Sequence, residues 1–212
     1  MEKKKILGYY NYTVVLTYIG MLTGFLGILY VFEENIGKAV LCLMVAGLCD
    51  MFDGTIASTR KRNKAEKCFG IQIDSLSDLI CFGTLPAIIV FADNKGNALA
   101  VLICAMYVLC ALIRLAYFNV DEQERQKKSS SERTLYMGMP VTVSALLLPA
   151  VYGGLCIFQI RSSTYLILLL LLMAVLFLAP VPLRKPKLLG KICMLLCGVM
   201  EALLVLFACM DV

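Results

Sequence analysis

The chain has 212 residues, of which 60% are hydrophobic and only 17% are charged, and its mean hydropathy is +0.83. This composition is typical of an integral membrane protein and leaves no room for a separate extramembrane domain. The chain contains no histidine, which excludes His-based nucleophilic catalysis and His-ligated metals. The net charge of +5 favours contact with anionic membrane lipids over nucleic acid, because the basic clusters lack interleaved aromatic residues.

Seven apolar segments are long enough to cross a bilayer as helices, which takes about 17–25 residues each. In chain order they are 12–32, 38–57, 69–91, 98–120, 136–160, 164–181 and 188–209. The first follows a basic start but is too long for a signal-peptide core, so we expect it to be retained. The predicted fold class is therefore all-α: a polytopic transmembrane helical bundle of about seven helices, six to eight, in a single domain over residues 1–212.

Lysine and arginine are distributed unequally between the two sets of alternating loops. Cytoplasmic loops are enriched in both residues. In this chain one set of loops holds three Lys or Arg residues, Lys38, Lys95 and Arg161, and Arg114 lies within a helix. The other set holds 16, namely Lys3, Lys4, Lys5, Arg60, Lys61, Arg62, Lys64, Lys67, Arg125, Lys127, Lys128, Arg133, Arg184, Lys185, Lys187 and Lys191. This asymmetry predicts a cytoplasmic N-terminus, and an odd number of helices would place the C-terminus outside.

Four aspartates occur in the stretch 50–78, at the expected cytoplasmic ends of two neighbouring helices. Asp50 and Asp53 are three residues apart and Asp74 and Asp78 are four apart, so each pair shares one helix face. Acids within apolar helices normally face a polar cavity and have a partner, since a charge facing lipid costs several kcal/mol. Two antiparallel helices joined by a short basic loop would bring the four carboxylates around one cavity.

Four like charges in one cavity would require cations. Carboxylate oxygens suit Mg²⁺, Mn²⁺ or Ca²⁺, and two such ions a few ångströms apart are a familiar device for clamping phosphates. The alternative interpretation is that the aspartates are helix caps or solvated charges near the membrane surface. That alternative fits Asp50 and Asp53 better than the second pair, which lies inside an apolar segment.

The pattern Asp50-x-x-Asp53-Gly54-x-x-Ala57, followed by Gly70-x-x-x-Asp74-x-x-x-Asp78, resembles the signature of the CDP-alcohol phosphatidyltransferases, integral membrane enzymes of phospholipid synthesis. The resemblance extends over most of the chain and implies one catalytic domain. It implies that Asp50, Asp53 and Asp74 hold two metal ions, Mg²⁺ or Mn²⁺ with Ca²⁺ as a further candidate, on the diphosphate of a CDP-alcohol. It also implies that Asp78 completes the second metal site and acts as general base on the incoming hydroxyl.

The same resemblance assigns Gly54, Ala57 and Gly70 to the nucleotide pocket, and Thr17 falls where the family often has a polar residue near the nucleotide. Core packing or helix capping would explain Thr17 equally well. The family usually has Arg directly after the alanine, where this chain has Ser58, and the spacer before Gly70 is longer than usual. We expect Arg60 or a neighbouring basic residue to supply the missing positive charge at the nucleotide.

Two later segments, 114–119 (RLAYFN) and 133–142 (RTLYMGMPVT), resemble the phosphatidylserine synthase branch of the family, the integral bacterial type. This implies phosphatidyl transfer from CDP-diacylglycerol to L-serine with release of CMP, a bacterial cytoplasmic membrane, and a homodimer. The residues expected to contact the alcohol or a lipid phosphate lie in region 114–140: Arg114, Asn119, Lys128, Arg133 and Tyr136. The alternatives are a structural ion pair for Arg114, ordinary cytoplasmic charge for Arg133 and a helix start at Tyr136.

Three other functions stay open on the sequence. The same chemistry with glycerol 3-phosphate or inositol phosphate would require a denser cationic pocket than one arginine within a helix provides. A divalent-cation transporter would carry acids on several helices, whereas Glu201 and Asp211 are the only acids in the last third of the predicted helices. A family member that binds the nucleotide-lipid without turnover is suggested only by Ser58.

Overall fold

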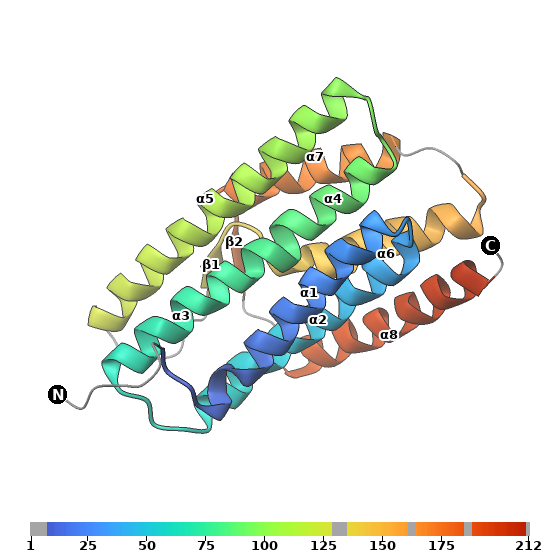
Figure 1. Cartoon of the computed structure of the whole chain (residues 1–212). Coiled ribbons are helices and arrows are strands. Elements are labelled where there is room, and N and C mark those ends of the chain that lie inside the picture. The colour runs from blue at the N-terminus through green and yellow to red at the C-terminus, as the bar shows by residue number, and fades with distance from the viewer. Residues whose placement is uncertain (1–7, 129–134, 161–163, 185–187, 211–212) are drawn as a thin grey trace.

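Figure 1 shows the computed structural model, which describes residues 8–128, 135–160, 164–184 and 188–210. Its α-helices are α1 (Val15–Phe32), α2 (Ile36–Ser58), α3 (Lys64–Asp78), α4 (Leu85–Ala92), α5 (Ala98–Lys128), α6 (Ser144–Ile157), α7 (Thr164–Leu178) and α8 (Leu188–Met210). Two 3-10 turns, η1 (Tyr12–Val14) and η3 (Val141–Val143), precede α1 and α6, and a π-helical segment, η2 (Leu79–Thr84), joins α3 to α4. Two short strands, β1 (Leu135–Met137) and β2 (Pro182–Arg184), complete the described elements.

The structure confirms the all-α bundle of apolar helices. Five helices in the described ranges are long and apolar enough to cross a membrane: Tyr12–Phe32, Ile36–Ser58, Lys64–Ala92, Ala98–Arg125 and Leu189–Phe207. Two shorter apolar helices, Val141–Ile157 and Thr164–Leu178, correspond to the other two predicted segments. Many large apolar side chains on the outer faces are exposed, among them Leu22, Leu102, Leu168 and Leu196. In an integral membrane protein such faces contact lipid.

The third predicted span, 69–91, begins earlier than expected. Asn63 accepts a hydrogen bond from the Glu66 backbone N–H (2.8 Å), and the Glu66 carboxylate accepts one from the Asn63 N–H (2.9 Å). This capping box stabilises the start of α3 at Lys64, so the helix includes the polar residues before position 69. α3, η2 and α4 then form one continuous rod, in which the π-helical turn follows directly after Asp78.

The prediction that a helix begins at residue 136 is wrong. β1 pairs antiparallel with β2, with Tyr136 opposite Leu183, and α6 begins only at Ser144. Gly138 has a φ of +79°, a conformation that glycine adopts without strain, and Pro140 follows it. These two residues prevent a helix from continuing through this stretch. The β1–β2 pair thus joins the segment between α5 and α6 to the segment between α7 and α8.

Close contacts of α1 with α2 and with the α3–α4 rod position the functional site. A Cβ atom on Gly24 would lie 2.5 Å from Cys81 Sγ, and one on Gly27 would lie 2.8 Å from Leu85 Cδ2. Small residues on this face of α1 therefore let the helices approach closely. Elsewhere α5 packs on α7, and α8 packs on α6 and α2. The end of α2 and the start of α3 lie at one end of the bundle, opposite the α1–α2 and α4–α5 connections (Figure 1).

Candidate metal centre

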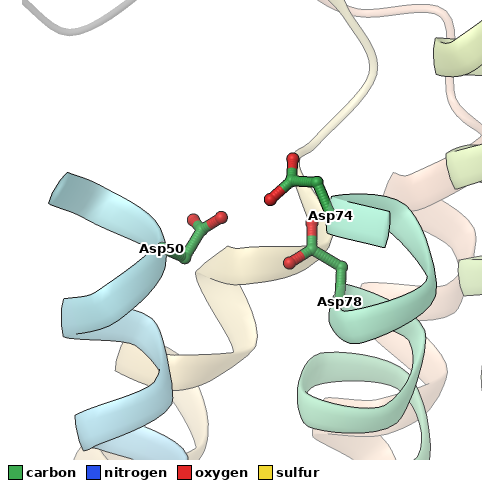
Figure 2. Close-up of side chains that lie close together, drawn as sticks. All are labelled: Asp50, Asp74 and Asp78. Carbon is green, nitrogen blue, oxygen red and sulfur yellow. The ribbon is translucent and has the colours of Figure 1, made fainter. Parts of the chain in front are cut away.

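Three of the four aspartates, from α2 and α3, converge on one point. Asp50 projects from α2, and Asp74 and Asp78 project from successive turns of α3, so that the three side chains point toward one another (Figure 2). Each contributes a carboxylate oxygen, and these oxygens all lie within 4.8 Å of one another. The helical spacings explain the geometry, because residues four apart on α3 present their side chains on one face.

Asp53 joins the group through a different set of contacts. Its Oδ2 accepts a hydrogen bond from Thr17 Oγ1 on α1 at 3.0 Å, and its carboxyl group lies against that of Asp74. Ser77, which lies between Asp74 and Asp78 on α3, donates its hydroxyl proton to the backbone oxygen of Thr17 at 3.4 Å. A turn of α1 is thereby held between the two acidic helices, and the otherwise unexplained polar residue Thr17 is a partner of the cluster.

All four aspartates line one small cavity at this helix junction. It occupies about 200 Å³ including its open mouth, and its other lining residues are Thr17, Gly20, Ala46, Cys49, Ser77, Cys81 and Phe82. Apart from Thr17 and Ser77, these neighbours are small or apolar. The cavity therefore concentrates acidic groups against a weakly polar wall, where electrostatic interactions are stronger than in water.

The donor set fits divalent cations that prefer oxygen. Ligand oxygens on opposite sides of an ion are separated by about twice the metal–oxygen distance, about 4.2 Å for Mg²⁺ and about 4.8 Å for Ca²⁺. The Asp50, Asp74 and Asp78 oxygens all lie within 4.8 Å of one another, close enough to share one such ion. One ion would be held by these three carboxylates, and Asp53, beside Asp74, extends the donor set toward a second. The carboxylate chemistry and spacing could thus hold a divalent cation, and the metal centre itself stays a prediction.

Three residues predicted to line the nucleotide pocket, Gly54, Ala57 and Ser58, follow Asp53 on α2 toward the α2–α3 loop and are not part of the cavity lining. Gly54 is exposed, and no described atom lies within 4 Å of the position that a Cβ would take there. Ala57 is half-buried on the same helix. Ser58 is exposed, and its hydroxyl donates to the Thr55 carbonyl at 2.6 Å. Gly54 thus leaves room beside the cluster at the end of α2.

Two basic residues near the cluster were not identified from the sequence. Arg62, in the α2–α3 loop, contacts Gly70 and is close enough to Asp53 to interact with it electrostatically. Lys191, on the first turn of α8, interacts in the same way with Asp50. The basic loop was a signal for Arg62, but which of its cations turns inward depends on the loop conformation. Lys191 is so far from the signature along the chain that only the packing of α8 on α2 reveals its position.

The residues predicted to bind the alcohol differ in how the structure places them. Arg114 is buried, donates to the backbone oxygens of Met139 (3.2 Å) and Gly138 (3.3 Å), and lies over the Phe118 ring. Asn119 accepts a hydrogen bond from Ser75 at 2.7 Å. It therefore lies beside the helix that carries Asp74 and Asp78. A direct contact with substrate stays a prediction for both residues.

The structure does not describe the side chains of the other three predicted alcohol or phosphate contacts, Lys128, Arg133 and Tyr136. Arg133 lies outside the described residues. Lys128 ends α5 and Tyr136 lies in β1, where its backbone pairs with Leu183, but their side chains are outside the described part. Among the residues predicted to contact the alcohol, Asn119 is thus hydrogen-bonded to the helix that carries two of the aspartates.

Comparison with known proteins gives the class that this fold and centre define. The family model for CDP-alcohol phosphatidyltransferases matches residues 10–194, a range that includes both acidic helices and every described helix up to the start of α8. The chain belongs to the CDP-alcohol phosphatidyltransferase family. It is thus a member of a metal-dependent family, and the acidic triad is present.

Individual relatives narrow the resemblance. The CDP-diacylglycerol–serine O-phosphatidyltransferase of Saccharomyces cerevisiae is 35% identical over 147 residues, which cover 64% of this chain and 52% of the yeast protein. The archaetidylserine synthase of Methanothermobacter thermautotrophicus is 30% identical over 72% of this chain and 62% of its own length. The CDP-diacylglycerol–serine O-phosphatidyltransferase of Bacillus subtilis is 30% identical over 73% of this chain and 77% of its own. The chain thus spans about half the length of the yeast relative and less than two thirds of the archaeal one.

Proposed function

We propose that the chain transfers a phosphatidyl group from CDP-diacylglycerol to the hydroxyl of L-serine, giving phosphatidylserine and CMP. The observation that carries this proposal is the convergence of Asp50, Asp74 and Asp78, with Asp53 beside them, on one cavity. The names of the yeast and Bacillus relatives support serine as the acceptor. In the reaction, the serine oxygen bonds to the phosphorus that carries diacylglycerol, and the bond from that phosphorus to the bridging diphosphate oxygen breaks.

The four carboxylates have distinct tasks in this proposal. Asp50, Asp53 and Asp74 would hold two divalent ions, Mg²⁺ or Mn²⁺ with Ca²⁺ as a further candidate, and these supply charge neutralisation of the diphosphate. Thr17 orients Asp53 by donating to its Oδ2. Holding the diphosphate and the serine hydroxyl together at this cavity would align the nucleophile with the leaving group, which removes much of the entropic cost of the reaction.

Asp78 would complete the second metal site and accept the proton of the serine hydroxyl. It lies one helical turn beyond Asp74 along α3 and points into the same cavity. A general base must come within about 2.6–3.2 Å of the proton donor in the bound complex. The position of Asp78 in the lining of this cavity, beside Asp50 and Asp74, supports its assignment as the base.

The membrane setting supports a cytoplasmic active site. The aspartates lie near the end of α2 and within α3, next to the basic α2–α3 loop, and this loop belongs to the set that carries 16 of the Lys and Arg residues. Enrichment of these residues favours the cytoplasmic side. We therefore place the N-terminus and the active site on the cytoplasmic face of a bacterial membrane, and we expect the chain to act as a homodimer.

A CMP-release assay tests the proposal. The purified full chain, in vesicles that contain CDP-diacylglycerol with Mg²⁺ or Mn²⁺, should release CMP when L-serine is added. Glycerol 3-phosphate and inositol phosphate serve as competing acceptors, and CMP release with either of them in place of serine would contradict the serine assignment. Metal flux into liposomes without any CMP release would instead support the divalent-cation transporter.

A further inference from the structure

The side chain of Arg62 lies beside Gly70, on the helix α3 that also carries Asp74 and Asp78. Its side chain is half-buried although it belongs to the short loop between α2 and α3. A Cβ atom on Gly70 would come within 2.9 Å of Arg62 Nη1, a distance that real Cβ contacts do not show. The guanidinium therefore lies directly against the glycine backbone, one turn before Asp74, and a side chain at position 70 would displace it from this position.

The other polar groups of the loop point to different partners. Arg60 pairs with Glu66 at 3.6 Å, and Glu66 also caps α3 through the Asn63 N–H. Ser58 bonds back to the carbonyl of Thr55. Arg62 is close enough to Asp53 for an electrostatic interaction, yet no carboxylate of the described residues lies within 4.0 Å of it. Its guanidinium donors thus remain free to bind an anion at the rim of the cavity.

We propose that Arg62 binds a phosphate of the nucleoside diphosphate group at the outer edge of the metal centre, with Gly70 providing the space for its guanidinium. The inference rests on the proposed function, because that function brings a diphosphate to this cavity. The planar guanidinium can donate two parallel hydrogen bonds to a phosphate, which gives both charge neutralisation and a fixed orientation. Arg62 thereby supplies on the loop the cation that position 58, a serine, does not.

Direct binding of CDP tests this assignment without turnover. The affinity of the purified full chain for CDP is measured calorimetrically in Mg²⁺, for the unmodified protein, Arg62→Ala, Arg62→Lys and Lys61→Ala. Arg62→Ala is expected to weaken binding roughly 10- to 100-fold, the usual effect of losing charge-assisted hydrogen bonds in a shielded site. The CDP affinity of Arg62→Lys is expected to lie between those of the unmodified chain and Arg62→Ala, because a lysine keeps the charge but cannot donate two parallel hydrogen bonds.

Lys61→Ala is the matched control, since it removes one positive charge from the adjacent, exposed position. Its affinity should stay within about twofold of the unmodified chain. An unchanged affinity in Arg62→Ala, or an equal loss in Lys61→Ala, would overturn the inference while CMP release by the unmodified chain upholds the proposed function. Failure of the unmodified chain both to bind CDP and to release CMP would overturn both. The melting temperature of each variant identifies any loss of folding, and Arg62→Lys then decides the assignment.

Discussion

The acidic cavity and the Arg114 region are two polar sites in one apolar bundle, and they are built in opposite ways. In the cavity, four carboxylates face one another and only Asp53 has a described hydroxyl donor, Thr17. Arg114 instead donates to the carbonyls of Gly138 and Met139, at the turn that follows β1. A site that collects more like charges than its neighbouring cations balance stores electrostatic repulsion that a ligand can relieve. A charge already bonded to the backbone mainly holds the fold together.

The largest effect is expected from Asp78→Asn, which keeps the shape of the side chain but removes the base. CMP release with L-serine should fall by roughly 10³-fold or more, as losing a general base typically costs 10²–10⁴-fold and a metal ligand is lost as well. CDP affinity should change only a few-fold, since Asp50, Asp53 and Asp74 remain. Single-turnover kinetics and CDP titration measure the two quantities. Turnover near the unmodified rate would mean that another group is the base.

Arg114→Ala should produce the next largest effect, and on stability. The substitution leaves a buried and a partly buried carbonyl group without this donor and removes a cation from the Phe118 ring. Each hydrogen bond that involves a charged group typically contributes about 1.5–3 kcal/mol to stability. The melting temperature in detergent should therefore drop, whereas Asp78→Asn should leave it unchanged or higher. An unchanged melting temperature with a raised KM for serine would restore Arg114 as a substrate contact.

A smaller loss is expected from Thr17→Val, which removes the hydrogen bond to Asp53 while keeping the volume of the side chain. Groups that orient metal ligands usually contribute 10- to 100-fold in affinity or activity, and we expect roughly 10-fold weaker Mn²⁺ binding. Thr23→Val is the matched control on α1, because its hydroxyl bonds only to the backbone oxygen of Ile19 on an exposed face. Equal Mn²⁺ affinities in the two variants would show that Thr17 does not support the centre.

The smallest effect concerns the link between the two regions, the hydrogen bond from Ser75 to Asn119. Ser75→Ala and Asn119→Ala should each lower stability by about 0.5–1.5 kcal/mol, and the double variant should cost no more than either change alone. Denaturation of the three variants gives the coupling. If Asn119→Ala alone also raised the KM for serine, Asn119 would contact the acceptor as the sequence predicts.

The difference between the regions also explains what the sequence could predict. Asp50, Asp53, Asp74 and Asp78 lie within helices, where periodicity fixes which side chains share a face, so their convergence follows once the two helices pack. The start of α6 was misplaced because the pairing of β1 with β2 links segments more than 40 residues apart, and no local pattern indicates it. The inward turn of Arg62 and the approach of Lys191 also depend on tertiary contacts. Composition places these cations near the membrane surface but cannot select among them.

Mn²⁺ binding to the purified full chain, followed by electron paramagnetic resonance of the free ion, tests the metal centre most directly. The unmodified chain is expected to bind about two ions, and Asp74→Asn should lose most of this binding because Asp74 belongs to the triad and also lies against Asp53. Glu201→Gln is the control, since Glu201 is an acid on α8 that lies outside the cavity lining. Lost Mn²⁺ binding in Asp74→Asn with retained binding in Glu201→Gln is the predicted result. Undiminished binding in Asp74→Asn would contradict the account.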